Sequence, residues 1–262
     1  MRFSDIKRLA QGDAVITAIV SYVMDVPPSK LFPHTEIPTN KLKKCLRIYK
    51  KCFKGVPLAY QIKKWHFMGR EFYVNKNVLV PRQDTEHLVV CALMESKKGD
   101  DILDVCTGSG VIAISLALEG RNLVAADISK RALKVAKKNS KKHECDIEFI
   151  RSDMFSKIGE RKFSMIVSNP PYVKIEDIGR FDKSIIKEPR LALDGGGDGL
   201  KFYRIIAEEA GKYLTEEGVL IMEIGHDQGD DVQSLFPNQE TKIIKDINGL
   251  DRVIIVKWKN QN

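Results

Sequence analysis

The sequence ILDVCTGSG, Ile102–Gly110, is the clearest structural pattern in this chain. Its first five residues are apolar apart from Asp104, which indicates a short buried strand, and its last four form a Gly-rich turn. The apolar segment at residues 111–118 follows and predicts a helix. A strand, a Gly-rich turn and a helix N-terminus together make a site where a ligand can lie against the backbone, because glycine has no Cβ atom.

Strands and helices alternate from this unit to the end of the chain. The apolar patterns predict helices at residues 85–94, 111–118, 130–143 and 199–214, and strands at residues 102–106, 123–128, 147–150, 163–168, 218–224, 241–246 and 252–257. Because strands alternate with helices, we expect an α/β fold with a doubly wound, mostly parallel sheet. Asn248-Gly249 separates the last two strands and predicts the turn of an antiparallel hairpin at the sheet's edge.

The first third of the chain has a different pattern. Apolar residues between positions 6 and 23 recur at helical spacing and predict one or two helices that end before Pro27-Pro28. A further helix is expected from Thr39 or Asn40 to residue 53. A hairpin with strands at residues 65–67 and 72–74 is expected around Gly69. In the helix expected to end at residue 53, the apolar side chains share one face and the lysines lie on the other. The residues of the apolar face are Leu42, Cys45, Leu46, Tyr49 and Phe53.

These patterns divide the chain into three parts. We expect a small helical domain at residues 1–62, a β-hairpin linker at residues 63–83 and a larger α/β domain at residues 84–262. The division follows the change from lysine-rich helical patterns to alternating strands and helices.

The positive charge of the chain is concentrated in the N-terminal region. The whole chain has 43 Lys and Arg against 35 Asp and Glu, a net charge of +8. Residues 1–80 hold 15 basic and 5 acidic side chains, whereas residues 81–262 hold 28 and 30. No acidic residue occurs between Glu36 and Glu71. This basic segment is either a solvated helix face or a docking surface for RNA or for a protein bound to RNA.

Acidic residues follow the next two predicted strands of the α/β domain. Asp127 is 17 residues beyond Gly110, at a strand end, where a carboxylate can accept hydrogen bonds from two ribose hydroxyls. Asp153 ends the third strand beside Met154 and Phe155, where an adenine ring could be sandwiched. Taken singly, the Gly-rich turn and Asp127 have plain structural explanations, a tight turn and a helix N-cap. Together they favour a nucleoside cofactor, either S-adenosylmethionine or a nicotinamide dinucleotide, since the turn also fits the G-x-G-x-x-A pattern.

The sequence Asn169-Pro170-Pro171-Tyr172 follows a predicted buried strand and is therefore expected at the carboxyl edge of the sheet. The prolines make the segment rigid, and the Asn169 side-chain oxygen and the backbone carbonyl after it are two acceptors that suit a planar –NH₂ group. Tyr172 gives a flat face for stacking. Because an amide or aromatic amine is a poor nucleophile, such acceptors would aim its nitrogen at a methyl sulfonium and stabilise the charge that develops on it. This chemistry requires neither a metal nor a covalent intermediate.

The sequence resembles the HemK/PrmC family, the peptide chain release factor glutamine methyltransferases. The resemblance covers most of the chain and rests on the segments Pro57–Tyr60, Phe67–Gly69 with Phe72, Leu79–Glu86, Asp104–Gly110, Val167–Tyr172 and Glu188–Gly196. It implies a seven-stranded class I S-adenosylmethionine-dependent methyltransferase domain, Rossmann-like, preceded by a helical domain that recognises the release factor and by the β-hairpin linker. It also implies an enzyme that transfers a methyl group from S-adenosyl-L-methionine to the side-chain amide nitrogen of the glutamine in the Gly-Gly-Gln motif of release factors, leaving S-adenosyl-L-homocysteine.

The same resemblance implies roles for individual residues. It implies no metal ligands. Cofactor contacts are implied for Cys106, Thr107, Gly108, Ser109, Gly110, Asp127, Met154 and Asn169, with Arg82 and Thr85 near the methionine end. The residues implied to hold the glutamine are Asn169, Pro170, Pro171 and Tyr172, of which Asn169, Pro170 and Tyr172 are the catalytic ones.

Four positions depart from the family pattern. Cys106 stands where the family has the first Gly of the cofactor loop, and its side chain at a tight turn is expected to weaken cofactor affinity slightly. Ser109 stands where the family has Thr, which is a benign change. The family also has Gly near Lys63 and Glu near His66. We expect His66 to be structural, because this reaction needs no general base.

Three other functions fit part of the sequence. A nucleic-acid amino-methyltransferase acting on adenine or guanine would use the same Asn-Pro-Pro-Tyr chemistry, but 80 N-terminal residues leave little room for a target-recognition domain. A nicotinamide-dependent oxidoreductase would use the Gly-rich loop, but no residue after the midpoint of the fold suits acid/base catalysis of hydride transfer. A non-catalytic RNA-binding protein would use only the basic segment.

The cysteines and the hydropathy pattern indicate the compartment. The five cysteines, Cys45, Cys52, Cys91, Cys106 and Cys145, include no C-x-x-C pair, which argues against a disulfide framework or a structural zinc site. The longest nearly unbroken apolar run, at residues 14–24, is too short to span a bilayer, and no signal peptide pattern is present. We expect a cytoplasmic protein without membrane association or a required nucleic acid, which binds release factors through its basic N-terminal domain.

Overall fold

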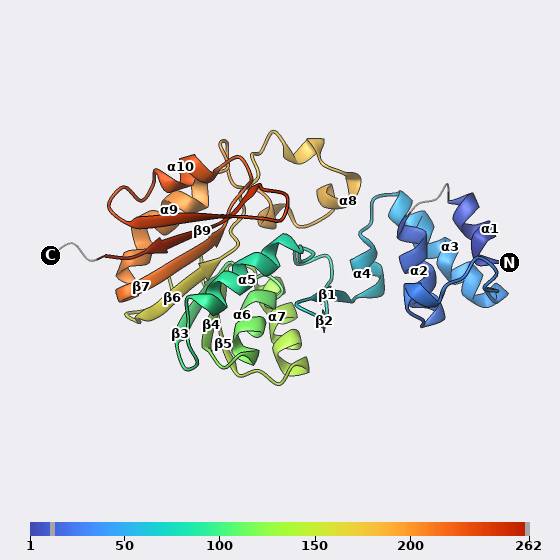
Figure 1. Ribbon diagram of the computed structural model, residues 1–262, viewed down its shortest axis with the longest axis horizontal. Helices are drawn as coiled ribbons and strands as arrows, with labels where there is room; N and C mark the ends of the chain where they lie inside the picture. The colour runs from blue at the N-terminus through green and yellow to red at the C-terminus, as the bar shows by residue number, and fades with distance from the viewer. Residues whose placement is uncertain (11–13, 260–262) are drawn as a thin grey trace. The chain divides into compact units, whose positions relative to one another are not determined.

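The computed structural model describes residues 1–10 and 14–259, which form two compact units (Figure 1). The smaller unit comprises Met1–Lys63 and Phe181–Lys187, and the larger unit comprises Lys64–Arg180 and Glu188–Asn262. A short segment from the second half of the sequence therefore belongs to the N-terminal unit. Gly55 shows this association, because a Cβ atom there would lie 2.6 Å from the Cβ of Lys183.

The smaller unit is helical. Its helices are α1 (Phe3–Leu9), α2 (Ala14–Met24), α3 (Thr39–Phe53), α4 (Leu58–Ile62) and α8 (Lys183–Ile186), with a 3₁₀ turn η1 (Pro28–Lys30). Its core is formed mainly by isoleucine and valine side chains of α1 and α2 packed against Cys45 and Ile48 of α3. The first two helices and the bounds of α3 agree with the sequence pattern, whereas α4 and α8 are too short to give a periodic signal.

The buried face of α3 differs from the predicted one. Cys45 and Ile48 are buried, but Leu46 is 44% exposed and Phe53 is 78% exposed. Leu46 follows Cys45 by one position and Phe53 follows Cys52 by one position, so each side chain points about 100° away from the preceding one around the helix. The predicted apolar face is therefore only partly buried, and Leu46 and Phe53 lie on its exposed side.

A tight hairpin begins the larger unit. β1 (Trp65–Phe67) and β2 (Arg70–Phe72) pair in antiparallel fashion, with Trp65 opposite Phe72. Met68 and Gly69 between them both have positive φ, 49° and 69°, as a two-residue hairpin turn requires. This short turn lets pairing start at Arg70, two residues before the predicted start of the second strand.

The larger unit contains a seven-stranded sheet in the order β5-β4-β3-β6-β7-β9-β8. Its strands are β3 (Asp101–Val105), β4 (Asn122–Asp127), β5 (Ile147–Arg151), β6 (Phe163–Ser168), β7 (Leu214–Glu223), β8 (Glu240–Lys245) and β9 (Asp251–Lys257). The first five in spatial order are parallel, and β9 is antiparallel to both of its neighbours, β7 and β8. The predicted mostly parallel sheet with an antiparallel hairpin at its edge is confirmed, and the hairpin is joined to the parallel strands through β9.

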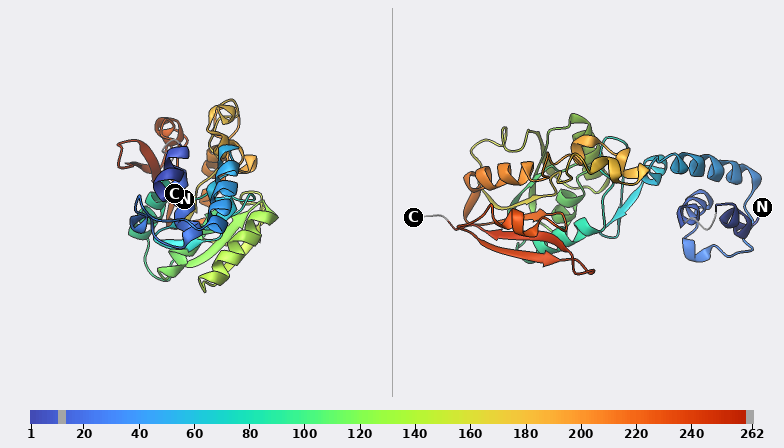
Figure 2. Two further views of the ribbon diagram at one scale, coloured as in Figure 1. Left: turned by 90° about the vertical axis from the view of Figure 1, so that its right-hand side faces the viewer. Right: turned by 90° about the horizontal axis from the view of Figure 1, so that it is seen from above.

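Helices cover both faces of this sheet (Figure 1 and Figure 2). Successive residues of β3 point to opposite faces, so Ile102 packs with α5 (Asp84–Met94) and α6 (Val111–Leu118), whereas Leu103 packs with α9 (Lys201–Glu209) and α10 (Gly229–Gln233). The larger unit also contains α7 (Lys130–Lys142) and the 3₁₀ turns η2 (Ile178–Arg180), η3 (Arg190–Ala192) and η4 (Ala210–Lys212). Within the described part of the chain, no helix is both long and apolar enough to cross a membrane.

Candidate functional site

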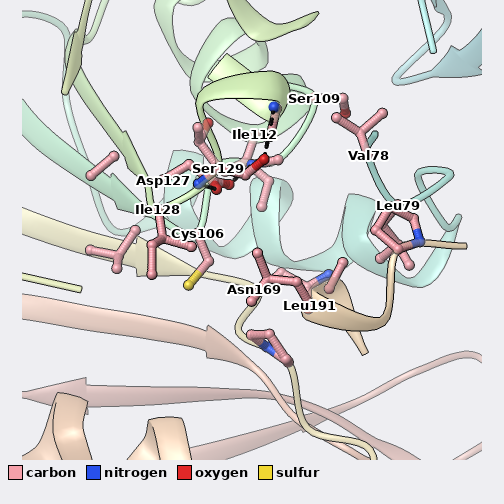
Figure 3. Close-up of a pocket in the computed structure, with 18 of the residues that line it drawn as sticks. Val78, Leu79, Cys106, Ser109, Ile112, Asp127, Ile128, Ser129, Asn169 and Leu191 are labelled. Carbon is pink, nitrogen blue, oxygen red and sulfur yellow. Dashed lines mark hydrogen bonds between the residues drawn. The ribbon is translucent and has the colours of Figure 1, made fainter. Parts of the chain in front are cut away.

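A cavity of about 230 Å³ opens beyond the carboxyl ends of β3, β4 and β6 (Figure 3). Open parallel sheets bind ligands at this edge. The residues predicted for the site that line the cavity are Thr85, Cys106, Thr107, Gly108, Ser109, Asp127, Met154, Asn169 and Pro171. Arg82, Gly110, Pro170 and Tyr172 are not among the lining residues. Asp153 lines the cavity as well, beside Met154.

The Asp127 carboxylate joins two loops at the cavity. It ends β4, and its two oxygens accept hydrogen bonds from the backbone N–H groups of Gly108, at 2.9 Å, and Ser129, at 2.7 Å. Burial raises the pKa of this carboxyl above its ordinary value. Each oxygen keeps a second lone pair, so the carboxylate can still accept hydrogen bonds from a ligand.

The Gly-rich turn has positive φ at several positions. Gly110, the N-cap of α6, has φ +81°, and a Cβ atom there would lie 3.0 Å from the Cβ of Ala136 in α7. Cys106 also has positive φ, 64°, and its Sγ lies 3.8 Å from the Sδ of Met154. Lys63 has φ 58°. Both Cys106 and Lys63 therefore have left-handed backbone, the conformation that glycine adopts most readily.

A buried carboxyl lies beneath the turn. Asp104 of β3 is fully buried, and its Oδ2 accepts a hydrogen bond from the Thr107 hydroxyl at 2.6 Å. Among the described residues, its other oxygen, Oδ1, is buried without a hydrogen-bond partner of regular geometry. Burial raises the pKa of Asp104 to about 7. The turn is thus fixed to the end of β3 by a carboxyl group that is largely protonated below neutral pH.

Asn139 of α7 supports the turn from behind and was not predicted from the sequence. It is completely buried, and its side-chain nitrogen donates hydrogen bonds to the carbonyls of Ser109 and Tyr73, each at 2.9 Å. Its side-chain oxygen accepts a hydrogen bond from the N–H of Tyr73 at 2.7 Å. The only local sign of this role is an amide on the apolar face of a lysine-rich helix, beside Ala136.

The Asn169 side chain is held by two partners from different elements. It follows β6, and its nitrogen donates hydrogen bonds to Oγ1 of Thr85, at 3.1 Å, and to Oε2 of Glu223, at 2.9 Å. The Tyr172 hydroxyl donates to the other Glu223 oxygen at 3.1 Å. Glu223 ends β7 and is 1% exposed, and burial raises the pKa values of both Glu223 and Tyr172. Sequence reasoning missed Glu223, although a single acid at the end of an apolar strand was a visible signal.

Arg82 is engaged by a buried acid. Its guanidinium lies 2.6 Å from Oε1 of Glu188, whose Oε2 accepts a hydrogen bond from the N–H of Val80 at 2.8 Å. Glu188 is 5% exposed, and burial raises its pKa. This ion pair fixes the segment that begins at Glu188, so that Pro189 and Leu191 form part of the cavity wall. Two of the motif segments, about 100 positions apart, therefore meet here.

No group of three or more His, Cys, Asp or Glu side chains among the described residues is arranged to hold a metal ion. The cavity instead offers backbone N–H groups, the carboxylates of Asp127 and Asp153, and apolar walls, which suit a nucleoside.

The sequence is similar to a known domain family and to named proteins. The model of the methyltransferase small domain matches residues 82–200. The release factor glutamine methyltransferase of Bacillus cereus is 39% identical over 240 residues, which is 86% of this chain and 84% of the relative. That of Aquifex aeolicus is 38% identical over 251 residues, 92% of this chain and 89% of the relative. The chain belongs to the release factor glutamine methyltransferase family.

Solved structures support the fold of this family member. A methyltransferase from Pyrococcus furiosus is similar with a TM-score of 0.59 at 15% identity, over 82% of this chain and 99% of that one. The E. cuniculi Mtq2–Trm112 complex, described as responsible for methylation of the eRF1 translation termination factor, gives a TM-score of 0.52 at 21% identity, over 70% of this chain and 99% of that one. The predicted class I methyltransferase fold is confirmed, and the chain is an S-adenosylmethionine-dependent methyltransferase.

Proposed function

We propose that this protein transfers a methyl group from S-adenosyl-L-methionine to the side-chain amide nitrogen of the glutamine in the Gly-Gly-Gln motif of peptide chain release factors. The observation that carries the proposal is the Asn169 amide at the cavity, whose –NH₂ group is already committed to Thr85 and Glu223. Its oxygen is thereby left to accept a hydrogen bond from a substrate. The names of the relatives support the choice of a glutamine amide as that substrate.

The cavity fits the cofactor. Asp127 has the acceptor capacity for ribose hydroxyls, and Ile128 and Met154 provide apolar surface for a flat ring. Gly108 has no Cβ and lets a ligand approach the backbone of the turn. Bound S-adenosylmethionine supplies an electrophilic methyl group on a sulfonium. We assign cofactor contacts to Thr85, Cys106, Thr107, Gly108, Ser109, Asp127, Met154 and Asn169, and supporting roles to Arg82 through Glu188 and to Gly110 through the start of α6.

The Asn169–Tyr172 segment would hold the glutamine amide. The Asn169 side-chain oxygen and the Pro170 carbonyl each take one N–H hydrogen, and the rigid prolines keep the two acceptors at a fixed spacing. Both acceptors are stronger partners for an amide nitrogen that gains positive charge than for a neutral one, so they stabilise the transition state more than the ground state. Pro171 forms part of the cavity wall, and the Tyr172 hydroxyl donates to Glu223, which would place its ring beside the substrate amide for stacking.

The basic segment of the smaller unit is the proposed docking surface for the release factor. Lys43, Lys44, Lys50 and Lys51 of α3 are all exposed, and no acidic residue lies between Glu36 and Glu71 to neutralise them. An acidic surface on a protein partner would satisfy them, and the reaction itself requires no nucleic acid. The five cysteines are thiols, which suits a cytoplasmic location.

The test offers labelled S-adenosylmethionine to the enzyme with a purified release factor and, separately, with ribosomal RNA. We expect label in the release factor and none in RNA. Label in RNA alone would overturn the proposal and favour a nucleic-acid amino-methyltransferase. A thermal-shift titration adds a second criterion, because stabilisation by a nicotinamide dinucleotide but not by S-adenosylhomocysteine would contradict the cofactor assignment.

A further inference from the structure

Glu223 occupies a buried position beside the residues that would hold the substrate. It is the last residue of β7, and its side chain is 1% exposed. In the parallel pairing of β6 with β7, Ser168 lies opposite Met222, so the next residues along the two strands are Asn169 and Glu223. The register of the sheet therefore brings this carboxyl next to the Asn169 amide.

The hydrogen bonds around Glu223 fix which way the amide faces. An ionised carboxylate only accepts hydrogen bonds, so the side of the Asn169 amide that contacts it must be the –NH₂ group. That group donates to Oε2 of Glu223 at 2.9 Å and to Thr85 Oγ1 at 3.1 Å. The Thr85 hydroxyl also forms a hydrogen bond with Glu223. Both amide hydrogens are used, and the Asn169 oxygen faces away from Glu223.

We propose that Glu223 is a positioning residue for methyl transfer: its carboxylate orients the Asn169 amide so that the oxygen, and not the –NH₂ group, meets the substrate amide. This inference rests on the proposed function and extends it to a residue that does not itself contact the substrate. The alternative amide orientation would place two donor groups against each other, the Asn169 –NH₂ and the glutamine –NH₂. That arrangement loses the acceptor on which the chemistry depends.

The role of Glu223 depends on its being ionised. The titratable and charged groups that face it are Asp84 of α5, Arg252 of β9, Tyr172 after β6, and Tyr203 of α9, whose hydroxyl donates to the Glu223 carbonyl at 3.0 Å. Burial raises the pKa of Glu223 despite the nearby Arg252 guanidinium. A protonated Glu223 carries an O–H donor, so one oxygen stops accepting and the amide is free to turn. Turnover should therefore fall on the acid side as Glu223 takes up its proton.

Two substitutions separate orientation from simple structural support. Glu223→Gln keeps the size of the side chain but cannot ionise, and its –NH₂ group is a donor in place of one acceptor oxygen, so this variant mimics the protonated acid at every pH. Glu223→Leu keeps an apolar volume of similar size and removes every acceptor. Glu217→Gln and Glu217→Leu, at an exposed position of the same strand, are the matched controls.

The experiment measures kcat for methylation of a release factor at saturating cofactor across pH, with S-adenosylhomocysteine affinity and thermal midpoint as folding controls. We expect Glu223→Leu to lower kcat about a hundredfold with nearly unchanged S-adenosylhomocysteine affinity. We expect Glu223→Gln to have a lowered kcat at every pH, like the protonated wild type, and to lose the fall at acid pH that the wild type and both Glu217 variants show. If Glu223→Leu does not fold, the pH profile of Glu223→Gln decides alone.

Two results would overturn this role. One is a Glu223→Gln variant that keeps the alkaline kcat of the wild type, or whose kcat falls at the same acid pH as that of the wild type. The other is a folded Glu223→Leu variant with wild-type kcat, which would reduce Glu223 to structural support. If the wild-type enzyme binds S-adenosylhomocysteine but methylates no release factor, the proposed function itself fails, and the role of Glu223 fails with it.

Discussion

The side-chain nitrogen of Asn169 lies 2.9 Å from Oε2 of Glu223, at the ends of two neighbouring parallel strands. This hydrogen bond connects the rigid Asn-Pro-Pro-Tyr segment to the centre of the sheet. Tyr172 shares the same carboxylate, so the first and last residues of that segment are held by one buried group. The proposed catalytic geometry thus depends on the framework of the sheet as well as on the loop.

Asn169→Ala should abolish methyl transfer and leave the cofactor site largely intact. The change removes one of two acceptors for the substrate amide, which should lower kcat by a factor of about a hundred or more. S-adenosylhomocysteine affinity, measured by calorimetry, should fall only modestly, because Asp127 and the Gly-rich turn are unaltered. Asn238→Ala, at an exposed position, is the control. Retained turnover in Asn169→Ala would refute the mechanism.

Asp127→Asn should weaken cofactor binding selectively. In the wild type, the N–H groups of Gly108 and Ser129 both donate to the Asp127 carboxylate. An asparagine has only one acceptor oxygen, so its –NH₂ group would face one of these N–H donors and leave that donor without an acceptor. The dissociation constant for S-adenosylhomocysteine should rise at least about tenfold, in line with the loss of a charged hydrogen-bond acceptor. Asp146→Asn, exposed just before β5, should leave it unchanged. An unaltered dissociation constant in Asp127→Asn would exclude Asp127 from the ribose site.

Asp104 should make the folded protein less stable as pH rises. Its pKa is about 7 in the folded state against an ordinary value of 3.8, so the folded state binds more protons between these values. The contribution of Asp104 to the free energy of unfolding is therefore greatest below pH 4. It decreases toward pH 7 by on the order of a few kcal/mol. Asp104→Asn removes the titration. Between pH 5 and pH 8, the thermal midpoint of Asp104→Asn should rise relative to that of the wild type. A difference between the two midpoints that stays constant with pH would contradict the assignment.

The lysines of α3 should control association with the release factor. Replacing Lys43, Lys44, Lys50 and Lys51 by Gln should weaken binding and reduce its salt dependence, because long-range attraction between charged surfaces is screened by ions. Replacing four exposed lysines of the larger unit, Lys134, Lys137, Lys141 and Lys157, removes the same charge and should have a smaller effect. Binding measured at several salt concentrations distinguishes the two sets. Equal effects would identify the α3 lysines as a solvated face.

Local patterns predicted most of the fold. The bounds of β6 agree with the sequence, as do those of α3 and α6, because their apolar periodicity and their turn residues coincide. The buried face of α3 was predicted poorly because Leu46 and Phe53 are apolar but lie off the side that packs on α1 and α2. Hydrophobicity identifies residues that can be buried, and packing selects among them.

The residues that support the site were harder to predict than those that line it. Asp127 and Asn169 follow strand ends in sequence, so their place at one edge is implied by parallel topology. The Arg82–Glu188 ion pair joins residues that no local pattern relates, and Asn139 reaches Tyr73 and Ser109 across three elements. Such long-range polar contacts depend on the three-dimensional arrangement of the chain, which spacing alone does not encode.

The central claim is tested most directly by mass spectrometry of a release factor after incubation with the enzyme and S-adenosylmethionine. We predict that fragmentation of the tip peptide places one added methyl group on the side-chain nitrogen of the glutamine in Gly-Gly-Gln, and that Asn169→Ala yields none. A release factor recovered unmodified by an enzyme that binds S-adenosylhomocysteine, or a methyl group on another residue, would contradict the account.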